Sequence, residues 1–150
     1  MKSPSSPRLL RSARIVAGAG IGAVGLLHLV WATGSSWPSR DADALAEAVL
    51  GGSAVRMPAS ACVVVGAPAL VAAAATAGAG GERGLARLTR YAAAGALLGR
   101  AAAGGVVAAR MLGLGNPGTR FQRLDAIVYR PLCLLLGVAA LVSARGADRA

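Results

Sequence analysis

Four apolar segments, each long enough to cross a lipid bilayer, constrain this chain more than any other feature of its sequence. A hydrocarbon core of about 30 Å requires about 20 helical residues, each adding about 1.5 Å. The segments lie at about residues 15–33, 59–80, 89–112 and 126–142. They predict an all-α fold, a four-helix transmembrane bundle.

The composition agrees with a membrane environment. Apolar residues make up 55% of the chain, and the mean hydropathy is +0.59. Lys and Arg number 16 against 6 acidic residues, a balance that fits either nucleic acid or an anionic lipid surface. The basic residues form short clusters between the apolar segments, and no basic face is interleaved with aromatic residues. We therefore expect membrane lipid, and no nucleic acid, as a partner.

The segments divide the chain into three parts. We expect a basic cytoplasmic leader at 1–13, a membrane domain at 14–143 and a cytoplasmic tail at 144–150. Between the first two spans, Asp41 and Asp43 precede apolar residues at helical spacing. Acidic residues in a first turn favour a helix, so this pattern predicts a short amphipathic helix on the membrane surface.

The last connection, 113–125, is rich in Gly, Asn and Pro and predicts a loop. Two glycine pairs at four-residue spacing, Gly18 with Gly22 and Gly95 with Gly99, predict close approach of membrane helices.

The distribution of Lys and Arg predicts the topology, because cytoplasmic flanks retain positive charge. Nine basic residues flank the spans on one side, and five flank them on the other or at its border. We therefore expect a multi-pass protein of the bacterial inner membrane with both ends in the cytoplasm. The alternative is that the leader, the first apolar run and 30–32 form a signal peptide with its cleavage site, which would leave three spans.

With this topology, most side chains capable of chemistry fall in the outer half of the membrane, whereas the inner half is almost entirely Ala, Val, Leu and Gly. We call the predicted site residues the outer-half cluster; they are His28, Trp31, Arg100, Asp125 and Tyr129.

Arg100 is the most informative member of the outer-half cluster. An arginine at a helix centre costs about 2.5–3.5 kcal/mol on insertion scales. Its counter-group could be Asp125, Tyr129, His28, backbone carbonyls or a bound anion. The alternative is that Arg100 only links helices or extends along its stem toward the surface.

The other members also have structural interpretations. His28 and Trp31 share one helix face, so they could line a pocket, or they could pack and set the depth of the helix. Asp125 could act in a site or cap the start of the fourth helix. Tyr129 could belong to an interfacial aromatic belt, and Arg130 could reach outward to headgroups.

A metal site would have to recruit residues from His28, Cys62, Cys133 and Asp125. No two of them have the helical spacing that would preorganise such a site, so we expect no metal or other cofactor. The sequence contains no Gly-rich phosphate loop, no HExxH motif and no paired carboxylates. It leaves open whether the two cysteines pair.

Three motifs together resemble a family. They are the run His28-Leu-Val-Trp31-Ala-Thr-Gly34-Ser-Ser-Trp37-Pro38, the arginine of the third span, and the run Phe121-Gln-Arg-Leu-Asp125-Ala-Ile-Val-Tyr129-Arg-Pro131-Leu132-Cys133. Over about residues 14–143 the chain is similar to small bacterial four-helix membrane proteins of unknown function. The resemblance implies that the outer-half cluster acts as one coupled unit. The chain departs from the family pattern at 101–105, where Ala and Gly replace a more polar and aromatic stretch.

These observations favour a binding or accessory module over an enzyme, with an outer-leaflet pocket for a lipid or small amphipathic ligand. One alternative is a membrane-embedded enzyme acting on a lipid or quinone-like substrate, with His28 as general base and Arg100 as the partner of an oxyanion or phosphate. Another is a small transporter or an assembly subunit; transport would require a homo-oligomer, and an assembly subunit a membrane-protein partner.

Overall fold

The computed structural model describes residues 7–52, 57–81, 84–111, 113 and 115–147, and these contain helices and no strand. The predicted all-α fold is therefore confirmed. Four basic residues used to predict topology, Lys2, Arg56, Arg83 and Arg149, lie outside these ranges. The elements are α1 (Pro7–Ala32), α2 (Ala42–Val49), α3 (Ala59–Ala77), α4 (Gly84–Met111), α5 (Thr119–Leu124), the π-helical turn η1 (Asp125–Tyr129) and α6 (Arg130–Ala147).

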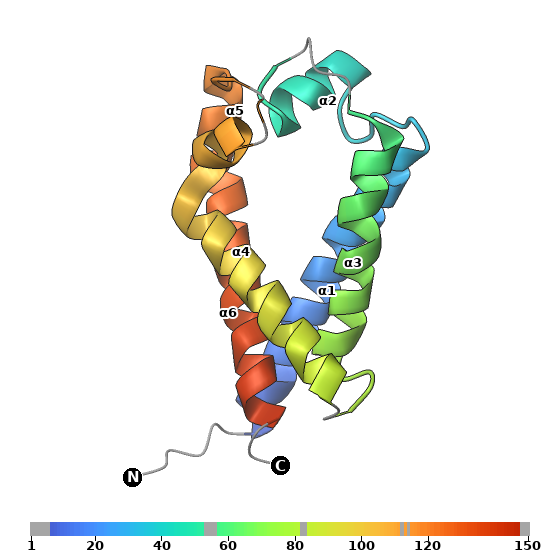
Figure 1. Ribbon diagram of the computed structural model, residues 1–150, viewed down its shortest axis with the longest axis vertical. Helices are drawn as coiled ribbons and strands as arrows, with labels where there is room; N and C mark the ends of the chain where they lie inside the picture. The colour runs from blue at the N-terminus through green and yellow to red at the C-terminus, as the bar shows by residue number, and fades with distance from the viewer. Residues whose placement is uncertain (1–6, 53–56, 82–83, 112, 114, 148–150) are drawn as a thin grey trace.

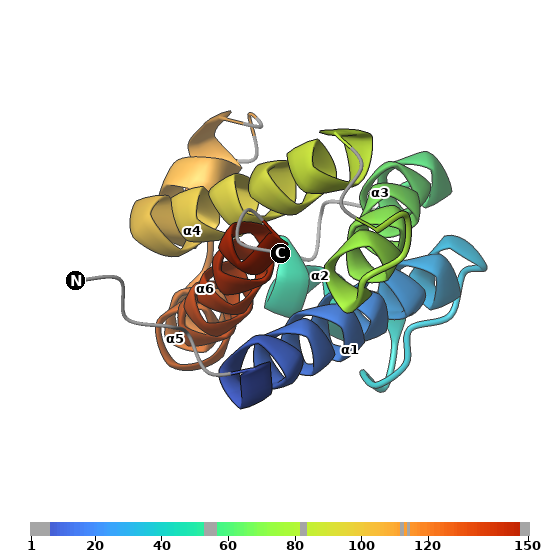
Figure 2. The ribbon, with the colours of Figure 1, turned by 90° about the horizontal axis from the view of Figure 1, so that it is seen from below.

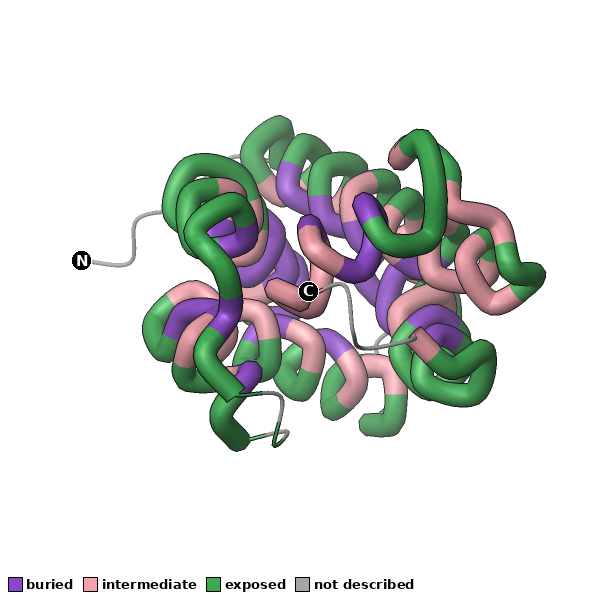
Figure 3. The backbone as a smooth tube through the Cα atoms, turned by 90° about the horizontal axis from the view of Figure 1, so that it is seen from above, coloured by how far each residue is buried: buried purple, intermediate pink, exposed green. Residues whose placement is uncertain are grey.

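Four helical stretches are long and apolar enough to cross a membrane: α1, α3, α4, and the continuous helix Thr119–Gly146 that joins α5, η1 and α6. The mean hydropathy of their most apolar windows lies between 1.5 and 2.0. Buried positions face the middle of the bundle, and exposed positions, many of them large and apolar, form its outside (Figure 3). An apolar exterior of this kind suits a lipid solvent.

The four long helices form two packed pairs. α1 lies along α3, and α4 lies along α6; the pairs meet where α1 contacts α6 and α3 contacts α4 (Figure 2). They converge at the end of the bundle where α1 begins and α6 ends, which we call the terminal end (Figure 1). They diverge toward the opposite end, where α2 and α5 lie, which we call the α2 end.

Small residues allow α1 and α3 to approach closely. A Cβ atom added at Gly18 would lie 3.0 Å from the Ala77 Cβ atom, and one added at Gly25 would lie 3.1 Å from the Gly66 carbonyl oxygen. A Cβ atom added at Gly22 would lie 3.6 Å from the Ala73 Cβ atom, so the packing predicted for Gly18 and Gly22 is confirmed. The prediction for Gly95 and Gly99 is wrong among the described residues, because none of their atoms lies within 4 Å of a Cβ added at either position.

The predicted surface helix is α2. Asp41 caps its start by accepting the Ala44 N–H at 2.7 Å, and its buried residues are Ala44, Leu45, Ala46 and Ala48. Two contacts connect α2 and its exit to α5: Glu47 pairs with Arg120 at 3.1 Å, and the Gly118 N–H donates to the Gly51 carbonyl at 2.8 Å. α2 therefore links the α1–α3 pair, from which it emerges, to the opposite pair.

Two predictions based on local sequence are wrong. Of the loop expected at 113–125, residues 119–125 are instead helical: they form α5 and the first residue of η1, which continues into α6 without a break. Arg90, one of the basic residues expected to flank the spans, is instead fully buried at the terminal end and donates to the Ala75 and Gly81 carbonyls at 2.7 Å. Those carbonyls lie at and just beyond the end of α3, where the helix leaves carbonyl groups without partners of its own.

Candidate functional site

An ion pair joins the third and fourth spans near the α2 end. Nη2 of Arg100, on α4, donates to Oδ1 of Asp125, in η1, and the Asp125 side chain is only 7% exposed. Of the counter-groups predicted for Arg100, the structure shows Asp125. The pairing offsets the cost of placing an arginine within an apolar helix.

Four residues beyond Arg100, α4 is broken. Gly104 has a φ of 75° and a ψ of 169°, a conformation that is strained for any residue with a Cβ atom. The break leaves backbone groups on both sides without their usual helical partners. The third span therefore loses regular helical geometry within the Ala- and Gly-rich stretch 101–105.

Charged side chains from the fourth span satisfy both sides of the break. Oδ2 of Asp125 accepts the Gly105 N–H at 2.7 Å, where the second half of α4 begins. Arg130 donates from Nε to the Ala101 carbonyl at 2.9 Å, where the first half ends. Each side chain also has the charge that favours the helix end it contacts.

These contacts correct two predictions. Asp125 does not cap the start of its own helix, because α5 precedes it without interruption; it caps the second half of α4 instead. Arg130 does not simply reach outward to headgroups, because its guanidinium group binds backbone carbonyls of α4.

The π-helical turn η1 positions Tyr129, another member of the outer-half cluster. π turns often occur at functional sites, because the extra residue per turn changes the direction of nearby side chains. The Tyr129 hydroxyl donates to the Ala48 carbonyl of α2 at 3.1 Å, and its ring lies 6.2 Å from that of Phe121. Tyr129 therefore fastens α2 to the same helix that carries Asp125.

His28 and Trp31 form a separate group on α1. Their rings are 4.9 Å apart, and Nδ1 of His28 lies 2.8 Å from the Val24 carbonyl oxygen. The Trp31 indole N–H donates to the Trp37 carbonyl at 2.7 Å, which fixes the turn that leaves α1. Within the described residues, no hydrogen bond, ion pair or ring contact joins this group to Arg100 or Asp125.

An apolar cavity lies among the four long helices. Its volume is about 400 Å³, within the range of about 300–1,000 Å³ found for small-molecule pockets. It opens between α3 and α4, because the lining residues Val65 and Pro68 on α3 and Ala92 and Ala96 on α4 are exposed. The remaining lining residues are Ile21, Val24, Ala69, Ala72, Thr89, Ala93, Leu97 and Leu136.

His28 on α1 and Arg100 on α4 lie one helical turn from residues that line this cavity. His28 follows the lining residue Val24 by four residues on α1, and Arg100 follows Leu97 by three on α4. Residues at these spacings share a helix face. By the same register, Cys62 and Cys133 stand one turn from lining residues on α3 and α6. We call these four residues the polar layer: His28, Cys62, Arg100 and Cys133.

One buried nitrogen of the polar layer lacks a hydrogen-bond partner among the described residues. Nη1 of Arg100 is buried and has no hydrogen-bond partner among the described residues. A buried donor without a partner is costly, more so on a charged group. The pair with Asp125 thus satisfies only part of the Arg100 guanidinium group.

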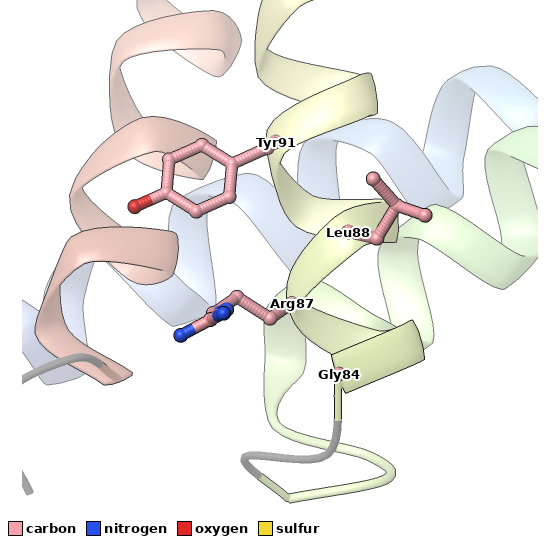
Figure 4. Close-up of a pocket in the computed structure, with 4 residues that line it drawn as sticks. All are labelled: Gly84, Arg87, Leu88 and Tyr91. Atoms are coloured by element: carbon pink, nitrogen blue, oxygen red, sulfur yellow. The ribbon is translucent and has the colours of Figure 1, made fainter.

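A second hollow, of about 650 Å³, lies at the start of α4 near the terminal end. Figure 4 shows its four lining residues, Gly84, Arg87, Leu88 and Tyr91, all on one stretch of a single helix. Arg87 and Tyr91 also interact with other groups of the protein. Because one helix supplies the whole lining, this hollow is a surface depression and not an enclosed site.

Several residues of the site were missed by sequence reasoning. The adjacent glycines 104 and 105 are the clearest sequence signal for a break in the third span. Arg130 lies five residues after Asp125, close to one turn of a π-helix, but a regular helix would place it elsewhere.

The described residues contain no group of three or more His, Cys, Asp or Glu side chains that could hold a metal ion.

The fold defines a small multi-pass membrane protein with four spans. The chain belongs to the family described as protein of unknown function DUF3995, whose model matches residues 21–140. The resemblance to a family of uncharacterised membrane proteins is thereby confirmed. No curated protein and no solved structure matches the chain.

Proposed function

We propose that this protein binds an amphipathic lipid-like molecule, with the apolar tail in the cavity and the polar end at the polar layer. The observation that carries the proposal is the cavity itself, which is lined almost entirely by aliphatic side chains and opens between two membrane helices. A tail could enter sideways from the bilayer without crossing water. The cavity volume lies at the lower end of the usual range, so we expect it to hold a single chain.

The outer-half cluster has distinct roles in this proposal. Arg100 meets the polar end of the ligand, with Asp125 holding its guanidinium group in place. His28 and Trp31 border the same space from α1. Tyr129 holds α2 across the α2 end. A binding or accessory role needs no further chemistry from these residues.

The proposal places the protein in the bacterial inner membrane, with the terminal end in the cytoplasm and the polar layer in the outer leaflet. The charge distribution supports this orientation. Of the described basic residues, Arg8, Arg11 and Arg14 gather at the start of α1, and Arg145 lies at the other terminus.

Photolabelling tests the cavity. Hexadecanol carrying a diazirine in its tail is added to the purified full-length protein in detergent, and the labelled peptides are mapped. We expect labelling at the lining stretches of α3 and α4, with competition by excess unlabelled hexadecanol. Ala93→Phe should block this labelling by filling the cavity, whereas Ala74→Phe, on an exposed part of α3 outside the lining, should not.

Annular lipid contact would give another result. Labelling spread over the outward faces of all spans, unaffected by excess hexadecanol and by Ala93→Phe, would contradict the proposal. Neutral hexadecanol is used so that the result reports on the tail alone.

A further inference from the structure

We infer that the polar end of the bound molecule is a phosphate group that accepts hydrogen bonds from Arg100. This inference rests on the proposed function and specifies its ligand. It depends on three observations about the α4 break: the charges gathered there, the two bonds that Asp125 already accepts, and the donor on Arg100 that has no partner among the described residues.

The charges at the break do not cancel. The guanidinium group of Arg100 pairs with the single carboxylate of Asp125, and that of Arg130 bonds the Ala101 carbonyl nearby. A Cβ atom added at Gly104 would lie 3.5 Å from Oδ2 of Asp125 and 3.7 Å from Cζ of Arg130, so these two groups lie beside the same backbone position. The cluster therefore carries two positive charges against one negative charge, a balance that favours an anion.

The carboxylate of Asp125 does not bond Nη1 of Arg100. Oδ1 accepts from Arg100, and Oδ2 accepts the Gly105 N–H at 2.7 Å. The carboxylate is thus committed in two directions, to the α4 backbone and to one nitrogen of Arg100. Nη1 of Arg100 remains buried and without a partner among the described residues.

A phosphate group fits the donor that remains. The planar guanidinium fork suits phosphate oxygens, and hydrogen bonds between charged groups are stronger than neutral ones. Arg100 stands one helical turn from Leu97 in the cavity lining, so a headgroup at Nη1 would be continuous with a tail in the cavity. A zwitterionic choline headgroup adds a positive charge beside two arginines and should be disfavoured.

Competition against the hexadecanol photoprobe tests the inference on the full-length protein. Palmitoyl lysophosphatidic acid and palmitoyl lysophosphatidylcholine share one tail and differ in headgroup. We expect the first to displace the probe at a concentration about tenfold lower, as one charge-assisted hydrogen bond would give. Inorganic phosphate is tested alone and with the probe, to separate a lipid phosphate from a soluble one.

The test variant neutralises Arg100 and Asp125 together, so that neither charge is left buried without its partner. In the double variant Arg100→Gln with Asp125→Asn, the preference should fall to about twofold or less while tail labelling persists, since only about one such bond is lost. Arg110→Gln removes an exposed arginine from the same end of α4, one that bonds Asn116, and should leave the preference unchanged. Thermal unfolding of both variants checks that they remain folded.

The outcomes separate the two proposals. Equal potency of the two lysolipids in the wild type, or a preference that survives in the double variant, would overturn the phosphate inference and leave the cavity intact. Absence of competable labelling would overturn the proposed function and this inference with it. Inorganic phosphate could also abolish the preference for lysophosphatidic acid while tail labelling is retained. That result would overturn the assignment to a lipid phosphate and indicate a phosphate site filled from solution.

Discussion

The carboxylate of Asp125 accepts the N–H of Gly105, a residue 20 positions earlier in the chain, and so closes a break inside a membrane helix. The same carboxylate pairs with Arg100 on the near side of the break. Backbone groups exposed within a membrane cost several kcal/mol each when they lack partners. The Asp125 side chain therefore does two tasks at once: it satisfies the broken backbone and neutralises the arginine beside it.

The two members of the Arg100–Asp125 ion pair should contribute to stability as a coupled unit. We expect Asp125→Leu to cost about 3–4 kcal/mol of unfolding free energy, since it strands a partly buried arginine and the Gly105 N–H. Arg100→Leu with Asp125→Leu should cost less than the sum of the single changes. A double-mutant cycle measured by denaturant unfolding in detergent gives the coupling energy, and additive single costs would show that the pair does not couple.

Gly95 and Gly105, both on α4, should respond in opposite ways to substitution by alanine. A Cβ atom at Gly105 would overlap the Phe121 ring, so Gly105→Ala should lower the unfolding temperature. At Gly95 there is open space, and alanine should gain about 0.5–1 kcal/mol from its higher helix propensity. Thermal unfolding of both variants makes the comparison, and a tolerated Gly105→Ala would argue against the close contact with η1 and α5.

Tyr129 should control how firmly α2 is held. Tyr129→Phe keeps the ring beside Phe121 but removes the hydrogen bond to the Ala48 carbonyl, at a cost of about 0.5–1.5 kcal/mol. Amide hydrogen exchange should increase in α2 and remain unchanged in α3. Unchanged exchange across 42–49 would mean that the apolar face of α2 and the Glu47–Arg120 pair hold it without Tyr129.

The orientation of the spans can be tested with single cysteines in a background lacking Cys62 and Cys133. With a membrane-impermeant maleimide applied to intact cells, we expect a cysteine at Ser39, near α2, to react. A cysteine at Gly84, which is exposed and has open space around it at the start of α4, should react only after the cells are opened. The reverse pattern would invert the topology and place the polar layer in the inner leaflet.

The sequence by itself determined the number of spans, their all-α character and the surface helix. These depend on local properties: runs of apolar residues match the bilayer thickness, and Asp41 signals a helix start whatever the rest of the chain does. The need for a counter-group at Arg100 was also predictable, because the cost of an unpaired charge in a membrane is general.

Only the tertiary structure decided how the polar residues are used. Three features depend on which part of the fourth span lies beside the break in the third span. They are the pairing of Asp125 with Arg100, the second bond of Asp125 to Gly105, and the bonds of Arg130 to the α4 backbone. The same is true of Arg90, whose partners lie at and beyond the end of α3. Spacing along one helix predicts which side chains share a face, but hydrogen bonds between helices depend on how their axes cross, and that crossing follows from packing along the whole bundle.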